Sequence, residues 1–386
     1  MNDGRRRIGV VTVARSDYGH LRSVLEAIRD EPRLALSLFV AGAHLAPAFG
    51  STVRDIERDG WPIAARIETI GSSDDAPGIA AATGRAVAGF GGAFAANRPD
   101  VLVVLGDRYE MLAAALAALP FTLPVAHIHG GETTEGAMDN QIRHAITKLS
   151  HVHLVSAEPH ATRVHAMGEE RWRVHTVGAP GLDRIAKTPR VSRAELAAEL
   201  NLPVEDRWLL VTFHPVTLEP EQTADHLDEL LAALEKVDAA PVITYPGADT
   251  AARGVIRKLQ EFAAGAPRAR VVPHLGDRAY LSLLAHADAM VGNSSSGIIE
   301  APSFALPVVN VGTRQQGRLR ARNVIDVGDG RDRIVAGIEA ALAPAFRESL
   351  HGLANPYGDG RAGARIVRIL RDVALDARLV RKREAE

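Results

Sequence analysis

Short apolar runs alternate with longer amphipathic stretches along most of this 386-residue chain. Each short run places apolar, often β-branched side chains at consecutive positions, so a strand formed there would be apolar on both faces. Such strands are typical of parallel sheets that are covered by helices on both sides. The predicted strands are 8–13, 36–41, 101–105, 125–129, 153–156, 208–213, 241–245, 269–273, 289–292 and 307–311.

The segments between these strands have helical periodicity. The predicted helices are 20–30, 109–119, 139–150, 221–237, 250–263 and 280–287. This alternation predicts an α/β protein with doubly wound parallel sheets. A segment rich in Gly, Pro and charge at 181–189 separates two series of strands. We therefore expect two Rossmann-like domains, 1–183 and 184–360, followed by a basic amphipathic helix within 361–386, a position compatible with packing back on the first domain.

Composition excludes several classes of function. The formal net charge is −2, which argues against a general nucleic-acid binder, and the chain has no cysteine. The absence of cysteine excludes disulfides, thiolate nucleophiles and iron–sulfur ligation. The apolar run near the start is too short for a secretory signal, and the run 111–125 is interrupted by Pro120 and Pro124. We expect a cytoplasmic protein that does not span a membrane.

Polar residues follow the predicted strands at the carboxyl edge of each sheet, where doubly wound folds bind their ligands. The first strand runs into ARSDYGH, which lacks the GxGxxG pattern of dinucleotide-binding proteins. Arg15 at a helix start makes a good seat for a phosphate, although Ser16 or Asp17 at this position also fits a simple helix cap. The next clear strand ends in GDRYE, which places Asp107 and Arg108 at the edge; Asp107 fits either a functional acid or a helix N-cap.

The following strand ends in HIHGGE. His127 and His129 alternate on one strand and would face the same way, the glycine pair 130–131 would let a ligand approach the backbone, and Glu132 follows. Two histidines on one face also suggest a zinc or iron site. No further histidine follows at ligand spacing, and acid/base chemistry explains the nearby carboxylates equally well, so we expect no metal. Asp139 then begins a helix, as its N-cap or as an active carboxylate.

In the second half, His214 lies beyond a buried strand and Asp249 opens a helix. A later strand runs into GNSSSGIIE, where Ser294, Ser295 and Ser296 at a helix start can supply hydroxyl and N–H donors to a diphosphate. Glu300 lies one turn further on and is suited to accept hydrogen bonds from a ribose. Arg314 and Arg318 follow the last predicted strand and add positive charge.

Taken together, these motifs resemble the hydrolysing UDP-N-acetylglucosamine 2-epimerases, which open bacterial sialic acid and related nonulosonate pathways. The resemblance runs in order from Arg15 to about Gly328. It is carried by ARSDYG, GDRYE, HIHGGE, DNQIRHAITK, TFHPVT, YPGAD, GNSSSGIIEAPS and VGTRQQGR. It implies the glycosyltransferase-B arrangement, in which two Rossmann-like domains face each other across a cleft.

The resemblance also implies roles for individual residues. The acid/base candidates near the sugar would be Asp107, Glu132 and Asp139, with His214 near the diphosphate or sugar. The substrate-binding candidates would be Arg15, Arg108, Asp249, Ser294, Ser295, Ser296, Glu300 and Arg314. Relatives that epimerise without hydrolysis, and some bifunctional hydrolysing relatives, carry Glu where this chain has His129. His129 therefore remains a catalytic candidate, while Glu132 or Asp107 becomes the stronger candidate for removing the C2 proton.

The expected reaction converts UDP-N-acetylglucosamine, or a close UDP-2-acetamido sugar, to UDP and a free sugar of the N-acetylmannosamine type. The alternative substrate is UDP-N,N'-diacetylbacillosamine. A glycosyltransferase of the same architecture needs only one base, and a sugar-nucleotide-binding protein needs no acids beside the sugar, so both fit the motifs less well. We expect no cofactor, no nucleic-acid partner, and a homodimer or homotetramer like similar enzymes.

Overall fold

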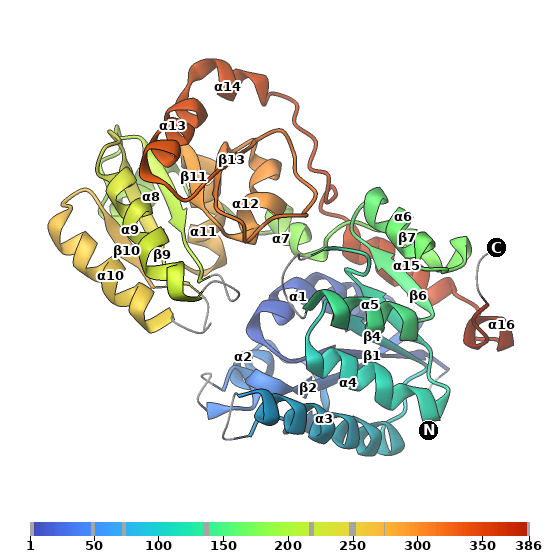
Figure 1. Ribbon diagram of the computed structural model, residues 1–386. Helices are drawn as coiled ribbons and strands as arrows, with labels where there is room; N and C mark the ends of the chain where they lie inside the picture. Colours follow the sequence, from blue (N-terminus) through green and yellow to red (C-terminus); the bar gives the residue numbers. More distant parts are fainter. Residues whose placement is uncertain are drawn as a thin grey trace. The chain divides into compact units, whose positions relative to one another are not determined.

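The computed structural model describes residues 4–47, 51–71, 75–133, 139–215, 220–246, 252–273 and 275–383. These residues form two compact units (Figure 1). The first unit comprises the described residues up to Thr133, those from Asp139 to Arg184 and those from Tyr357 onward; the second comprises Ile185–Pro356. Each unit contains one parallel sheet with helices on both faces, which is the α/β class that the sequence predicts.

The first unit is built on a seven-stranded parallel sheet with the order β3-β2-β1-β4-β5-β6-β7. Its strands are β1 (Arg6–Thr12), β2 (Leu34–Ala41), β3 (Ile63–Ile67), β4 (Val101–Leu105), β5 (Val125–Ile128), β6 (Val152–Val155) and β7 (Val174–Thr176). The order reverses between β1 and β4, so the helices that follow these two strands lie on opposite faces. Ligands of doubly wound sheets bind outside the carboxyl ends of the strands at such a reversal.

Two sets of helices cover this sheet. One face packs against α1 (Arg15–Asp30), α2 (Val53–Arg58), α15 (Ala362–Asp372) and α16 (Ala377–Val380). The other face packs against α3 (Ala76–Ala96), α4 (Tyr109–Ala118) and α5 (Asp139–Leu149). The remaining helices are α6 (Glu158–Ala166) and α7 (Asp183–Lys187), and the chain passes into the second unit within α7. Short 3₁₀ segments in the described part of this unit include Gly42–His44, Leu119–Phe121, Arg171–Arg173 and Pro180–Leu182.

Among the described residues, α3 alone is long and apolar enough to cross a membrane by length and composition. Its buried residues are Ala82, Ala86, Phe90 and Phe94. Phe94 packs edge-on against Phe39 of β2, with ring centroids 5.3 Å apart. One face of α3 therefore belongs to the core of the first unit.

The C-terminal segment, dark red in Figure 1, returns to the first unit. Helix α15 packs against α1, and Gly363 permits the approach, because a Cβ there would meet the Ser23 carbonyl oxygen at 2.9 Å. The buried Asp183 carboxylate accepts hydrogen bonds from the backbone N–H groups of Ala362 (2.9 Å) and Gly363 (2.7 Å). These bonds satisfy two N–H groups that the first turn of a helix otherwise leaves unpaired.

The carboxylate of Glu169, which is only 1% exposed, also holds the C-terminal segment against the first unit, through Lys382. It pairs with His153 (2.9 Å), Lys148 (2.9 Å) and Lys382 (2.8 Å). Burial opposes ionisation, but these donors outweigh it and lower the pKa of Glu169 to about 2. Because the pKa is depressed in the folded protein, the pairing stabilises the fold fully above the ordinary glutamate pKa, and this contribution is lost as pH falls through about 2.

Glu169→Gln should therefore lower the free energy of unfolding by about 2–3 kcal/mol at pH 7, and by progressively less as pH falls from about 5 towards 2. Urea denaturation at several pH values measures the difference from the wild type. The exposed Glu68→Gln is the matched control and should show no loss at any pH. A Glu169→Gln loss that stayed constant down to pH 2.5, roughly the lower end of that window, would contradict the ionic origin of the effect.

The second unit is built on a six-stranded parallel sheet with the order β10-β9-β8-β11-β12-β13. Its strands are β8 (Trp208–Thr212), β9 (Ala240–Thr244), β10 (Arg270–Val272), β11 (Ala289–Gly292), β12 (Val308–Val311) and β13 (Val324–Val327). Here the order reverses between β8 and β11, which makes the carboxyl ends of these strands the expected ligand edge.

One face of this sheet packs against α9 (Thr223–Leu234), α10 (Ala252–Gly265) and α13 (Arg331–Leu342). The other face packs against α8 (Arg193–Leu200), α11 (Gly276–His286) and the 3₁₀ segment Ala301–Phe304. The short helix α12 (Ser295–Ile299) follows β11, α14 (Pro344–Ser349) follows α13, and a 3₁₀ segment covers Pro220–Gln222. Trp208 is fully buried between these layers.

Candidate functional site

In the first unit, the predicted site residues follow the strands at the carboxyl edge of the sheet. Arg15 is the first residue of α1, which follows β1. Asp107 and Arg108 follow β4, and Glu132 follows β5. Asp139 is the first residue of α5, where it is half-buried. Parallel strands bring their carboxyl ends to one edge, which is why residues so far apart in sequence collect there.

Arg143 of α5 connects two of the predicted acids. Its guanidinium forms an ion pair with the Asp107 carboxylate and donates a hydrogen bond to the main-chain carbonyl of Glu132 (2.9 Å). The Arg143 side chain is almost fully buried, whereas the Asp107 side chain is 25% exposed, so the ion pair is partly buried and the bond to the Glu132 carbonyl is fully buried. Arg143 lies within the DNQIRHAITK motif, but its sequence position alone indicates no role. The available signal was that Arg143 lies one helical turn after Asp139, at the start of the helix that follows β5.

The Glu132 carboxylate lies in a buried hydrogen-bond cluster. Its Oε1 accepts from the Ser156 hydroxyl (2.7 Å) and lies 2.5 Å from His129 Nδ1. Ser156 follows β6, and its Oγ also lies 2.9 Å from Nδ1 of His160 on α6. Burial lowers the pKa of His160, which favours the neutral imidazole near pH 7. Sequence reasoning missed Ser156 and His160.

The two histidines of the HIHGGE motif do not share a strand face. Strand β5 ends at Ile128, and His129 adopts a left-handed backbone with φ of 65°. His127 is buried, and its ring contacts the Gly106 carbonyl (2.8 Å) and the Thr147 hydroxyl (3.2 Å). Burial lowers the pKa of His127 to about 3. His127 is therefore a neutral core histidine, whereas His129 contacts the Glu132 carboxylate.

The two glycines of this motif serve the packing of the loop. A Cβ at Gly131 would meet the His160 carbonyl oxygen at 2.4 Å, and its φ is 75°. A Cβ at Gly130 would meet His127 Nδ1 at 3.0 Å. Gly131 thus needs glycine for contacts within the first unit, and the space at Gly130 is tight.

At the start of α1, Asp17 turns back and accepts hydrogen bonds from the backbone N–H groups of Val13 (2.8 Å) and Ala14 (2.7 Å) and from the Thr12 hydroxyl (2.9 Å). Burial raises the pKa of Asp17 to about 6, although these donors act in the opposite direction. Asp17 thus caps the turn, and Arg15 is the exposed cation beside it.

Arg108 is exposed at the same edge, and its Nε lies 3.5 Å from Oε2 of Glu110. The Glu110 side chain is fully buried, and neither of its oxygens has a hydrogen-bond partner within the described part of the chain. The guanidinium of Arg108 therefore partly compensates a buried carboxylate in addition to facing solvent.

In the second unit, Asn293 joins three loops that follow strands. His214 N–H donates to Asn293 Oδ1 (2.7 Å), and Asn293 Nδ2 donates back to the His214 carbonyl (2.8 Å). The Asn293 carbonyl accepts from Arg314 (3.1 Å) and from Gln315 (2.8 Å). The predicted residues His214 and Arg314 are thus held at one edge by a buried asparagine that the sequence analysis did not single out.

The three serines begin α12 and are half-buried. The Ser294 hydroxyl caps the helix by accepting from Ser296 N–H (3.3 Å), and the Ser296 hydroxyl accepts from Tyr280 (2.7 Å). Two of the three hydroxyls therefore have structural partners, and for Ser295 the described residues provide none. Glu300 follows α12 and is buried.

Asp249 lies outside the described residues. Within the described ranges, no group of three or more His, Asp or Glu side chains is arranged to hold a metal ion.

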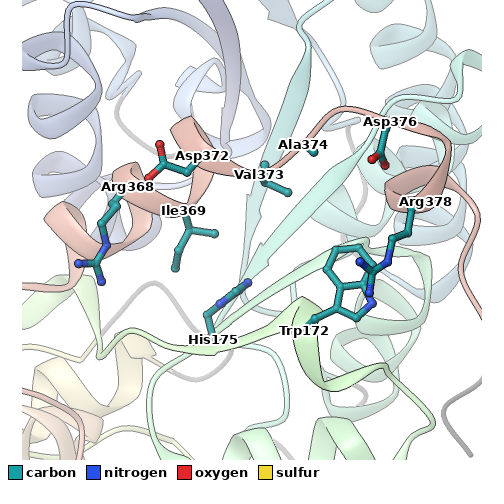
Figure 2. A pocket seen from close by; sticks show the side chains of 9 residues that line it. All are labelled: Trp172, His175, Arg368, Ile369, Asp372, Val373, Ala374, Asp376 and Arg378. Carbon is teal, nitrogen blue, oxygen red and sulfur yellow. The ribbon is translucent and has the colours of Figure 1, made fainter.

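A pocket of about 400 Å³ lies elsewhere in the first unit, between Trp172, His175 and the C-terminal helices (Figure 2). The Arg378 guanidinium lies over the Trp172 indole, 4.4 Å from the ring centroid. None of the predicted site residues lines this pocket.

Solved structures with the same fold bind UDP. The S. aureus MnaA–UDP co-structure superposes with a TM-score of 0.77, covering 95% of this chain and 96% of that one, at 17% identity. This similarity supports the glycosyltransferase-B type of fold, two doubly wound units in one chain.

Closer relatives match in sequence. A "UDP-N,N'-diacetylbacillosamine 2-epimerase (hydrolyzing)" from Legionella pneumophila is 37% identical and covers 98% of each chain. A "GDP/UDP-N,N'-diacetylbacillosamine 2-epimerase (hydrolyzing)" from Campylobacter jejuni is 36% identical over 83% of this chain and 84% of its own. A family profile described as UDP-N-acetylglucosamine 2-epimerase matches residues 26–371. The chain therefore belongs to the UDP-N-acetylglucosamine 2-epimerase family.

Proposed function

We propose that the protein is a hydrolysing 2-epimerase, which converts a UDP-2-acetamido sugar to UDP and a free sugar of manno configuration. The observation that carries the proposal is the cluster at the sheet edge of the first unit, in which Arg143 contacts the Asp107 carboxylate and the main-chain carbonyl of Glu132. A protein that only bound a sugar nucleotide would have no need for two acids at this edge. A glycosyltransferase would need one base, whereas epimerisation with elimination needs two proton transfers.

The chemistry follows from the weak acidity of the C2 hydrogen. Loss of UDP from C1 builds positive charge beside C2, and removal of the C2 proton then gives a 2-acetamidoglucal. Return of a proton to the opposite face of C2, with addition of water at C1, gives the free manno sugar. In this scheme Glu132 or Asp107 takes the C2 proton, Asp139 and His129 are the further acid/base candidates, and each transfer is general acid–base catalysis.

The second unit would bind the leaving group. The α12 N-terminus with Ser294, Ser295 and Ser296 would hold the diphosphate, with Arg314 adding positive charge. Preorganised donors aimed at a leaving oxyanion are usually the largest single contribution to catalysis. Glu300 would accept hydrogen bonds from the ribose, His214 would lie near the diphosphate, and Asp249, Arg15 and Arg108 are further proposed contacts.

The double variant Ser295→Ala, Arg314→Ala should weaken UDP binding by about 100-fold, because it removes one hydroxyl donor and one charged donor. Isothermal titration calorimetry with UDP measures the affinity. Ser349→Ala with Arg347→Ala removes the same two side-chain types from an exposed helix, and should leave it unchanged. Equal affinity in the double variant and the wild type would refute the diphosphate assignment.

The proposal names UDP-N-acetylglucosamine as the first candidate substrate, which the description of the family supports. The names of the Legionella and Campylobacter relatives fit the alternative, UDP-N,N'-diacetylbacillosamine, equally well. Chromatography of each nucleotide after incubation with the protein, with NMR of the sugar, tests both. We expect UDP and a manno-configured reducing sugar from one of them. A UDP-linked epimer as the final product would instead indicate epimerisation without hydrolysis.

We further propose that the protein works in the cytoplasm as a homodimer or homotetramer, without a cofactor or metal. The near-neutral charge and the absence of cysteine are compatible with that setting. Gel filtration with light scattering measures the oligomeric state, and a monomer at working concentration would contradict it.

A further inference from the structure

We infer that Ser156 and His160 are positioning residues that hold Glu132 ionised and oriented as a proton acceptor, through a chain of hydrogen bonds from imidazole to hydroxyl to carboxylate. The chain consists of His160 Nδ1, Ser156 Oγ and Glu132 Oε1, with separations of 2.9 Å and 2.7 Å. The inference deepens the proposed function, on which its kinetic consequences rest.

Burial isolates the three groups from bulk water. The exposed fractions are 2% for Ser156, 4% for His160 and 8% for Glu132. A hydrogen bond at low local dielectric is stronger than one in water, and bonds in a chain polarise one another. The hydrogen bonds from His160 to Ser156 and from Ser156 to Glu132 therefore meet little competition from solvent.

The direction of the chain follows from counting hydrogens. The Ser156 hydroxyl has one hydrogen, which it donates to Glu132. Its contact with His160 must then use a lone pair of the hydroxyl oxygen, so the imidazole donates from Nδ1. Because burial lowers the pKa of His160, the ring is neutral near pH 7 and has this one N–H. Donors directed at an ionised carboxylate favour its charged form.

Other polar and charged groups lie around Glu132. His129 Nδ1 lies 2.5 Å from the same oxygen, from the loop after β5. From α5, Arg143 donates to the Glu132 carbonyl and pairs with Asp107, which follows β4. From α6, Arg163 donates to the Gly131 carbonyl. The two arginines also favour an ionised Glu132. Both arginines and the His129 contact remain when Ser156 is changed, so a Ser156 variant isolates the contribution of the hydrogen bonds from Ser156 and His160.

The positions of Ser156 and His160 matter for function because Glu132 must keep one orientation while the sugar reacts. Ser156 is fixed by the end of β6 and His160 by the first turn of α6, so the carboxylate is held by two rigid elements rather than by its own loop. Misplacement of a catalytic group by about 1 Å can cost on the order of 100-fold in rate.

The kinetic test compares Ser156→Ala, which breaks the chain, with Ser156→Thr, which keeps the hydroxyl. For Ser156→Ala we expect kcat to fall about 10- to 100-fold with KM little changed, and the acidic limb of the kcat–pH profile to move up by about one to two pH units. Ser156→Thr should recover most of both effects, and His160→Phe should resemble Ser156→Ala. A Ser156→Ala profile with an unmoved acidic limb would overturn the inference, even if kcat fell.

A second measurement needs no turnover, which keeps the failure of this inference distinct from that of the proposed function. In ¹³C-glutamate-labelled protein, the titration midpoint of the Glu132 carboxyl should move up in Ser156→Ala and stay near the wild-type value in Ser156→Thr. The ¹⁵N shifts of His160 should report a neutral ring protonated at Nδ1 near pH 7. An unmoved midpoint, or a ring protonated at Nε2, would overturn the chain whether or not the protein turns over a UDP-sugar.

Discussion

Glu132→Gln and Asp107→Asn should each reduce turnover of the UDP-sugar at least about 1,000-fold while UDP still binds. Both substitutions keep the size and shape of the side chain but remove the group that accepts a proton. The proposed acid/base residues lie in the first unit, whereas the proposed serine and Arg314 contacts with the diphosphate lie in the second. We therefore expect kcat to fall with little change in UDP affinity.

Initial rates of UDP release and calorimetric binding of UDP measure the two effects separately. Glu158→Gln on α6 is the matched control, since this carboxylate is exposed and bonds only to the Thr176 hydroxyl among the hydrogen bonds described. Thermal unfolding of each variant checks that the fold survives, because Asp107 pairs with the buried Arg143. Near-normal rates in either variant would remove that acid from the reaction.

The second large effect concerns stability. Arg173 is fully buried, and its guanidinium donates to the carbonyls of Arg378 (2.8 Å), Leu379 (2.8 Å) and Arg381 (3.3 Å) near the end of the chain. It also pairs with Glu170 (2.7 Å). Arg173→Met should lower the free energy of unfolding by about 3–5 kcal/mol, because it leaves a carboxylate and buried carbonyls without their donor.

Urea denaturation measures this loss, and limited proteolysis shows whether residues 378–383 become accessible before the rest of the first unit. The exposed neighbour Arg171→Met is the matched control and should change stability by less than about 0.5 kcal/mol. If the two variants were equally stable, the contacts of Arg173 with the C-terminal segment would contribute nothing to the free energy of unfolding.

Most of the two sheets could be predicted from the sequence, and the omissions have a common cause. The strands β3, β7 and β13 were not predicted, and each lies at an edge of its sheet. These three strands are partly exposed, as their half-buried residues show, and lack the continuous apolar run that marks a buried strand, whereas the fourth edge strand, β10, lies within the predicted strand 269–273. The central strands, apolar on both faces, were all found.

The candidate site shows where single-sequence reasoning ends. That Asp107, Glu132 and Arg314 lie at the carboxyl edges of their sheets could be predicted from where the predicted strands end. The interpretation of His127 and His129 as a pair on one face was wrong, because β5 ends one residue earlier and His129 takes a left-handed backbone. Such a local turn cannot be read from the alternation of side chains, which holds only within a strand.

The residues that organise the site were not predicted for a different reason. Arg143, Ser156 and Asn293 act through partners that are distant in sequence, such as Arg143 with Asp107, which is 36 positions away. Polar residues of these types are common on surfaces, and only the folded structure shows that these three are buried beside the residues that they contact.

The fate of the C2 hydrogen tests the central claim most directly. The protein should be incubated with its UDP-sugar substrate in D₂O, and the released free sugar examined by proton NMR and mass spectrometry. The account predicts one deuterium at C2 of a manno-configured product, because acids of the first unit remove and return a proton there. A free sugar that keeps its original hydrogen at C2 would contradict it and leave simple hydrolysis.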